Sequence, residues 1–185
     1  MAEFIAEYGS IILVAIKDTL IMVVLSTGFG YLLGIPLGIV AYVTDHGSIS
    51  ENAVVNTVVG WFINIVRSIP FIILILFLVP YTRLIMGTAS GTRGVIFPLV
   101  ISAAPFIARM VESSFNELDS GVIESARAMG ATNLQIIWKV LLPESFPSLL
   151  RGMGIATITI VGYIAMAGMV GGGGLGAVAI TDHDS

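Results

Sequence analysis

The hydrophobic pattern of the chain begins with a long uncharged stretch near the N-terminus. Thr19–Val43 holds 25 residues without a charged side chain. As an α-helix it would be about 37 Å long, enough to cross the ~30 Å hydrocarbon core of a bilayer with some tilt. Ile11–Ile16 extends the pattern, which places Lys17 and Asp18 near the outer end of the span. The polar residues 45–52 predict a short loop after it.

The second apolar stretch, Ala53–Thr82, is interrupted only by Arg67. Neither half is long enough to cross a bilayer alone, so the two halves predict one span with an arginine near its middle. Pro70 follows three residues later and predicts a break in the helix. Pro80 and the segment Tyr81–Gly94, with two arginines and three glycines, predict a loop.

Two further apolar stretches, Val95–Met110 and Gly152–Met169, predict a third and a fourth span. The segment between them, at about 112–150, holds seven of the 20 charged residues and is the longest part outside lipid. Gly171–Gly174 predicts a flexible turn, and Thr181–Ser185 predicts a polar tail. The pattern therefore indicates an all-α polytopic membrane protein of four spans, with no strand signal and no tandem repeat.

Composition supports a membrane protein and excludes several other classes. The 185 residues are 56% hydrophobic and 11% charged, against about 25% charged in soluble domains. This length predicts a single transmembrane domain over residues 1–185. The net charge of −4 and the scattered basic residues argue against nucleic-acid binding. The chain has no cysteine, which excludes disulfides and thiolate chemistry, and its acidic N-terminus predicts a retained helix rather than a cleaved signal.

Basic residues predict the orientation in the membrane, because cytoplasmic loops are enriched in Lys and Arg. Four of them lie within or beside the segment between spans three and four: Arg109, Arg127, Lys139 and Arg151. The loop between spans two and three has Arg83 and Arg93. We therefore expect residues 112–151 in the cytoplasm and the N-terminus outside.

The most specific motif lies in the segment predicted to be cytoplasmic. It reads Glu124-Ser125-Ala126-Arg127-Ala128-Met129-Gly130, followed by Val140-Leu141-Leu142-Pro143. It resembles the EAA motif of ABC importer permeases, with Ser125 in place of an alanine and Val140 in place of an isoleucine. The resemblance implies an ATPase-docking role for Glu124, Ser125, Ala126, Gly130, Val140, Leu142 and Pro143.

The chemistry of these residues suits a knob that enters a cleft on a soluble partner. Val122–Met129 and Leu134–Leu142 predict two short helices hinged at Gly130. Small side chains, such as that of Ala126, would allow close approach of the partner. We expect Pro143 to end the second helix, whose apolar face would hold Leu134, Ile137, Val140 and Leu141. The alternative is an ordinary cytoplasmic loop with two amphipathic turns.

The resemblance extends over nearly the whole chain. The segments Arg67-Ser68-Ile69-Pro70-Phe71, Ala103-Ala104-Pro105-Phe106-Ile107-Ala108-Arg109-Met110-Val111-Glu112 and Gly173-Gly174-Leu175-Gly176 look like parts of methionine ABC importer permeases. That family implies a homodimer, two copies of an ABC ATPase, a substrate-binding lipoprotein and methionine, including its D-isomer, as cargo. It also implies that ATP and Mg are bound by the ATPase, so that this chain is not an enzyme and needs no cofactor.

One departure separates the sequence from that family. Family members continue past the Gly-Leu-Gly segment into a fifth helix, whereas this sequence ends at Ser185. We therefore expect a fold without the last helix, as in a fragment, a frameshifted product or a short version. Two alternatives stay open: a permease for another amino acid or a small organic anion, and a non-transporting membrane fragment or scaffold.

Arg67 and Pro70 are candidates for the translocation path. A charge near mid-bilayer is costly unless it faces a cavity or a partner. The alternative is that Arg67 stabilises the break before Pro70, where a backbone hydrogen bond is lost. Gly30, Gly34 and Gly38 form a small-residue stripe on one face of the first span, which predicts close helix packing.

Other motifs carry little chemistry. Gly171, Gly173 and Gly176 fit G-x-G-x-x-G, but a dinucleotide site requires a strand before the motif and a membrane helix precedes it here. His46 and His183 lie far apart without metal-ligand spacing, so no metal site is expected. An intramembrane enzyme would need a nucleophile or metal set that the sequence does not show.

Overall fold

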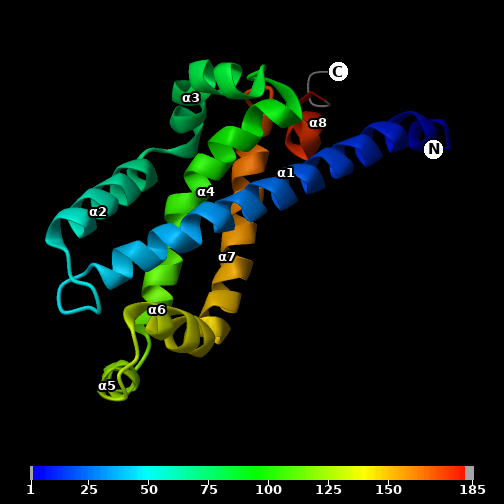
Figure 1. Ribbon diagram of the computed structural model, residues 1–185. Coiled ribbons are helices and arrows are strands. Elements are labelled where there is room, and N and C mark those ends of the chain that lie inside the picture. The colour runs from blue at the N-terminus through cyan, green and yellow to red at the C-terminus, as the bar shows by residue number, and fades with distance from the viewer. Residues whose placement is uncertain (1, 182–185) are drawn as a thin grey trace. The chain divides into compact units, whose positions relative to one another are not determined.

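The computed structural model describes residues 2–181, and every regular element in that range is helical. This confirms the all-α prediction. The elements are α1 Ala2–Val43, α2 Ala53–Ser68, α3 Phe71–Met86, α4 Gly91–Asn116, α5 Ser120–Ala128, α6 Asn133–Ile136, the π-helix η1 Ile137–Leu141, α7 Leu142–Gly168 and α8 Gly174–Thr181 (Figure 1). The part of the predicted polar tail beyond Thr181 lies outside the described residues.

Three helical segments are long and apolar enough to cross a membrane: Gly9–Val43, Gly91–Asn116 and Asn133–Gly168. The pair α2 and α3 adds a fourth span if the two are counted together. The first helix is longer than predicted, since α1 has 42 residues. Lys17 and Asp18 therefore lie well inside the helix rather than near its end.

The second apolar stretch forms two helices rather than one. Proline has no N–H and disfavours helical geometry in the residue before it, so α2 ends at Ser68 and a new helix begins after Pro70. The carbonyl of Pro70 accepts bonds from the N–H groups of Ile73 and Leu74, at 2.9 and 3.0 Å. Arg67 lies in the last turn of α2, directly before the break, and is near the middle of the span if α2 and α3 are counted as one.

The predicted loop at Tyr81–Gly94 is wrong over most of its length. Pro80 lies inside α3, which continues to Met86, and α4 already begins at Gly91. The helix ends where Gly87 adopts φ +76°, with its N–H bonded to the carbonyl of Arg83. A glycine that can adopt positive φ therefore ends α3, seven residues after the proline.

The helices pack as two compact units, to each of which α1, α4 and α7 contribute one part. One unit comprises the described residues of Met1–Gly30, Ile69–Ala103 and Thr157–Ser185. In it, the rings of Phe71 and Tyr163 stack with centroids 4.7 Å apart. The N–H of Leu175, at the start of α8, donates to Thr19 Oγ1 at 3.0 Å. The sequence reading missed α8. The single-domain assignment of residues 1–185 stays a prediction.

The other unit comprises Tyr31–Ser68 and Ala104–Ala156. Here two glycines of the predicted stripe, Gly34 and Gly38, lie directly against α4. A Cβ on Gly34 would lie 2.7 Å from Ile107 Cβ, and one on Gly38 would lie 2.5 Å from the carbonyl oxygen of Ala108. The absence of a side chain is therefore what allows α1 and α4 to approach. Gly30, the third glycine of the stripe, is buried in the first unit.

We expect Gly38→Leu to lower the yield of folded, detergent-stable protein several-fold, because the new side chain would displace the backbone of α4. Gly28→Leu is the matched control, since an added Cβ at Gly28 meets nothing within 4 Å. Size-exclusion chromatography of both variants measures the effect. A monodisperse Gly38→Leu protein at normal yield would show that the close approach is dispensable.

Candidate functional site

The first part of the motif, from Glu124, lies on α5, and both ends of that helix are capped. At the start, Asp119 Oδ1 accepts the N–H of Gly121 at 2.8 Å. At the end, Gly130 adopts φ +81°, a conformation that favours glycine. The N–H of Gly130 bonds to the carbonyl of Arg127 at 2.9 Å, and that of Ala131 bonds to the carbonyl of Ala126 at 3.1 Å. These two bonds form a Schellman motif, which fixes where α5 stops.

The second short helix, α6, begins two residues later with a capping box. Thr132 Oγ1 accepts the N–H of Gln135, and Gln135 Oε1 accepts the N–H of Thr132. Two short helices thus flank Gly130, as predicted, and Figure 1 shows α5 and α6 following α4.

The prediction that Pro143 ends the second helix is wrong. Helix continues from α6 through the π-helix η1 into α7 without interruption. Within η1 the N–H of Leu142 bonds to the carbonyl of Ile137, five residues earlier. Pro143 falls in the first turn of α7, directly after the π-helix, and so lies inside this continuous helix rather than at its end. The segment from α5 to η1, which we call the docking segment for the role proposed below, therefore leads directly into a helix that is long and apolar enough to cross a membrane.

The π-turn also changes which side chains are buried. Ile136 and Leu141, five residues apart, are both fully buried. Leu134, which was predicted to share one apolar face with Leu141, is 69% exposed. Val140, Ile137 and Leu142 are partly buried, and Pro143 is exposed. Leu134 and Leu141 are seven residues apart and would share one face of an α-helix, but the π-turn between them has more residues per turn, so Leu134 is exposed where Leu141 is buried.

Three large apolar side chains on the two sides of Gly130 are exposed. The exposed fractions are 82% for Met129, 69% for Leu134 and 67% for Trp138, and we name these three side chains the docking surface for the role proposed below. Glu124 and Ser125 are exposed on α5, and the Ser125 hydroxyl donates to the carbonyl of Gly121 at 2.7 Å. A serine is therefore accommodated at that position by its own helix.

Ala126 has a different role from the one predicted. It is 4% exposed, so its small side chain packs inside the unit and is not available for close approach by a partner.

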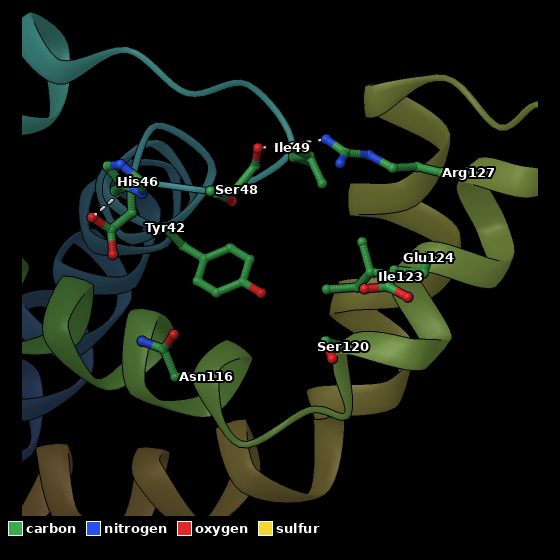
Figure 2. Close-up of a pocket in the computed structure, with 11 residues that line it drawn as sticks. Tyr42, His46, Ser48, Ile49, Asn116, Ser120, Ile123, Glu124 and Arg127 are labelled. Atoms are coloured by element: carbon green, nitrogen blue, oxygen red, sulfur yellow. Dashed lines mark hydrogen bonds between the residues drawn. The ribbon is translucent and has the colours of Figure 1, made fainter.

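A cavity of about 210 Å³ lies between α5 and the α1–α2 connection. Figure 2 shows Ile123 and Glu124 of α5 on one side and Tyr42 of α1 on the other, with Asn116 of α4 at the edge. Arg127 extends past the cavity to the carbonyl oxygen of Ser48, at 3.4 Å.

Residues 34–182 match the family described as the binding-protein-dependent transport system inner membrane component. The chain belongs to this family. It is accordingly a multi-pass inner membrane protein and a transport component.

Named relatives agree with that assignment. A probable D-methionine transport system permease protein of Vibrio cholerae is 47% identical over 180 residues, which cover 97% of this chain and 80% of the relative. The D-methionine transport system permease protein of Escherichia coli K12 is 50% identical, over 82% of this chain and 70% of its own length. An inward-facing structure of the MetNI methionine ABC transporter matches with a TM-score of 0.90 and 48% identity, covering 92% of this chain and 79% of that one.

In this family member the two candidates for the translocation path lie at the break between α2 and α3. Arg67 is exposed in the last turn of α2, and Pro70 is exposed where α3 begins. Ser68 Oγ donates to the carbonyl of Asn64 at 2.7 Å, which satisfies one carbonyl at the end of α2. A role in the path for Arg67 and Pro70 stays a prediction.

A polar cluster that sequence reasoning did not single out joins α2 to α4. Arg109 Nη1 lies 2.6 Å from Glu112 Oε2, and Arg109 Nη2 donates to Asn64 Oδ1 at 2.9 Å. The Glu112 side chain is only 15% exposed. Opposite charges three residues apart on a helix are a signal that could have indicated the pair, whereas the distant Asn64 could not have been found from spacing.

Among residues 2–181 no group of three His, Cys, Asp or Glu side chains could hold an ion. The His46 side chain is 95% exposed, and His183 lies outside the described residues. The predicted turn in the glycine-rich segment lies between α7 and α8, where Gly171 and Gly173 adopt positive φ.

Proposed function

We propose that the chain is the permease subunit of an ABC importer for methionine, in both its D- and L-forms. The observation that carries the proposal is the 47–50% identity to D-methionine permeases over 82–97% of the chain. The docking segment supports it, since two short capped helices present exposed apolar side chains beside an exposed carboxylate.

In the proposed assembly two copies of the chain form the path and each docks one ABC ATPase. A substrate-binding lipoprotein delivers the cargo from outside, while residues 112–151 face the cytoplasm. ATP and Mg are bound and ATP is hydrolysed on the partner subunits, so the chain itself needs no cofactor. Closure of the ATPases displaces α5 and α6, and the continuous helix from α6 through η1 to α7 carries that displacement into the membrane.

The test is reconstitution of the chain with the ATPase in liposomes, with the lipoprotein on the outside-facing side and labelled L-methionine as cargo. We expect ATP-dependent uptake that an excess of D-methionine abolishes. Excess histidine and excess succinate are the matched competitors, and neither should reduce uptake.

Three results would contradict the proposal in different ways. Uptake that histidine or succinate suppresses would favour a permease for another amino acid or an organic anion. A chain that binds no ATPase would favour a membrane scaffold. ATPase binding without uptake of any cargo would show that the path is not formed.

A further inference from the structure

The connection between α1 and α2, residues 44–52, is a braced turn. The N–H of Ser50 bonds to the carbonyl of Val43 at 2.9 Å, and the N–H of Asn52 bonds to that of Thr44 at 3.0 Å. Glu51 Oε2 accepts the N–H of Gly47 at 2.9 Å. Backbone and side-chain bonds across so few residues fix the loop to the end of α1.

The first residues of α2 are fixed to the same turn. Asn56 Nδ2 donates to the carbonyl of Ala41 at 2.8 Å and lies 3.5 Å from Thr44 Oγ1. A force applied to the turn therefore acts on the ends of both α1 and α2.

The braced turn, residues 44–52, lies near α5 at two places. The first is polar: Arg127 Nη2 donates to the carbonyl oxygen of Ser48 at 3.4 Å, in a hydrogen bond assisted by the guanidinium charge. The second is apolar and involves Ile49. The Ile49 side chain is 7% exposed, although the next residue, Ser50, is exposed. Figure 2 shows Ile49 on the side of the cavity that faces Ile123 of α5.

Arg127 suits this position for geometric and electrostatic reasons. It lies in the last turn of α5, where a positive charge is favoured by the helix dipole. Its long side chain crosses the space beside the cavity, which a shorter residue would leave open (Figure 2). The acceptor is a main-chain carbonyl, so the contact does not depend on which side chain position 48 carries.

We propose that residues 44–52 and α5 move as one body, and that Arg127 is the positioning residue that joins them. The inference rests on the proposed function, because the displacement that matters is the one imposed on α5 by the ATPase. Through Arg127 that displacement reaches the ends of α1 and α2 directly, in addition to the covalent route through α6, η1 and α7. The docking segment then drives three membrane helices rather than one.

The first test is the coupling ratio, which is methionine taken up per ATP hydrolysed in liposomes. We expect Arg127→Ala to lower this ratio roughly fivefold while ATPase association stays unchanged, as loss of one exposed charge-assisted bond would do. Arg127→Lys should restore part of the ratio. Ser48→Ala is the matched control and should keep the wild-type ratio, since it retains the accepting carbonyl.

Loss of ATPase association in Arg127→Ala would overturn the proposal, because Arg127 would then belong to the docking surface. An unchanged coupling ratio would overturn it as well.

The second test measures the two parts directly and does not depend on transport. The chain has no cysteine, so His46→Cys and Ala128→Cys introduce one pair of exposed spin-label sites per copy, and an excess of unlabelled chain in the assembly confines the measurement to pairs within one copy. We expect one narrow distance distribution that is the same in the nucleotide-free and ATP-bound complexes. In Arg127→Ala the distribution should broaden.

A distance that shifts between the two states of the otherwise native chain would show that the turn and α5 move independently. If the chain transports no methionine, the proposed function fails while the distances still decide this inference. Should Arg127→Ala not yield monodisperse protein, Arg127→Gln carries the same expectations in both tests.

Discussion

Replacing Gly130 with valine is expected to release the ATPase from the purified complex while leaving the chain in the membrane. Gly130 adopts φ +81°, and an added Cβ there meets nothing within 4 Å. The effect would therefore come from backbone strain alone, about 1–3 kcal/mol for a β-branched residue in this region. Relief of the strain breaks the bonds that end α5, so the two helices of the docking segment lose their relative placement.

We expect the affinity for the ATPase to fall at least about tenfold, given that strain. Gly130→Asn is the conservative variant, because asparagine tolerates a left-handed conformation, and it should retain most of the affinity. Gly154→Val controls for valine in place of glycine, since Gly154 lies in α7 with open space around an added Cβ. Co-purification at equal membrane expression is the measurement. Equal ATPase recovery with Gly130→Val and Gly130→Asn would contradict the assigned role of the backbone at this position.

The membrane helices could be predicted from the sequence because each apolar residue of a long run adds to the same hydrophobic signal. In lipid, the backbone N–H and C=O groups of an uncharged run as long as Thr19–Val43 can all be hydrogen-bonded within the run only if it is a helix. This holds whatever packs against the helix. The same holds for the break at Pro70, which follows from the missing N–H. Gly34 and Gly38 could also be selected, because their four-residue spacing places them on one face before the identity of the facing helix is known.

The boundaries that the sequence reading missed depend on competition between local and distant interactions. Pro80 was read as the end of a helix, yet α3 continues past it to Met86. The glycines from Gly171 onward were read as one turn, yet α8 starts at Gly174, where the N–H of the next residue finds Thr19 Oγ1. A hydrogen bond to a residue so distant along the chain gives no signal in the hydrophobic pattern near Gly174.

The docking segment shows the same limit at the level of single faces. The sequence predicted a short helix on each side of Gly130, but it did not predict that the second one continues into α7. The predicted shared face of Leu134 and Leu141 is not present, because the π-turn at Ile137–Leu141 changes the number of residues per turn between them. Leu134 is exposed and Leu141 is buried, while Ala126, on α5, is buried independently of that turn. The exposed side chains that we propose to contact the ATPase could therefore be identified only from the structure.

Trp138 is expected to be the side chain of that surface whose loss weakens ATPase binding most. It is 67% exposed on η1, and Leu134, four residues earlier, is 69% exposed on the preceding turn. A large apolar side chain on water-facing surface gains free energy only when a partner covers it, and tryptophans dominate such contacts. We expect Trp138→Ala to weaken ATPase binding to the chain in nanodiscs roughly thirtyfold, the effect of losing a contact of about 2 kcal/mol.

The chain offers a closely matched control for this substitution. Trp61 in α2 is 69% exposed, but it lies in a stretch assigned to the membrane, so Trp61→Ala should leave the affinity for the ATPase unchanged. Leu134→Ala should have a smaller effect in the same direction as Trp138→Ala. If Trp138→Ala changes affinity no more than Trp61→Ala does, then Trp138 anchors the helix end at the lipid–water interface, where tryptophan is also favoured. The ATPase would in that case have to bind through α5 and Met129, on the other side of the Gly130 hinge.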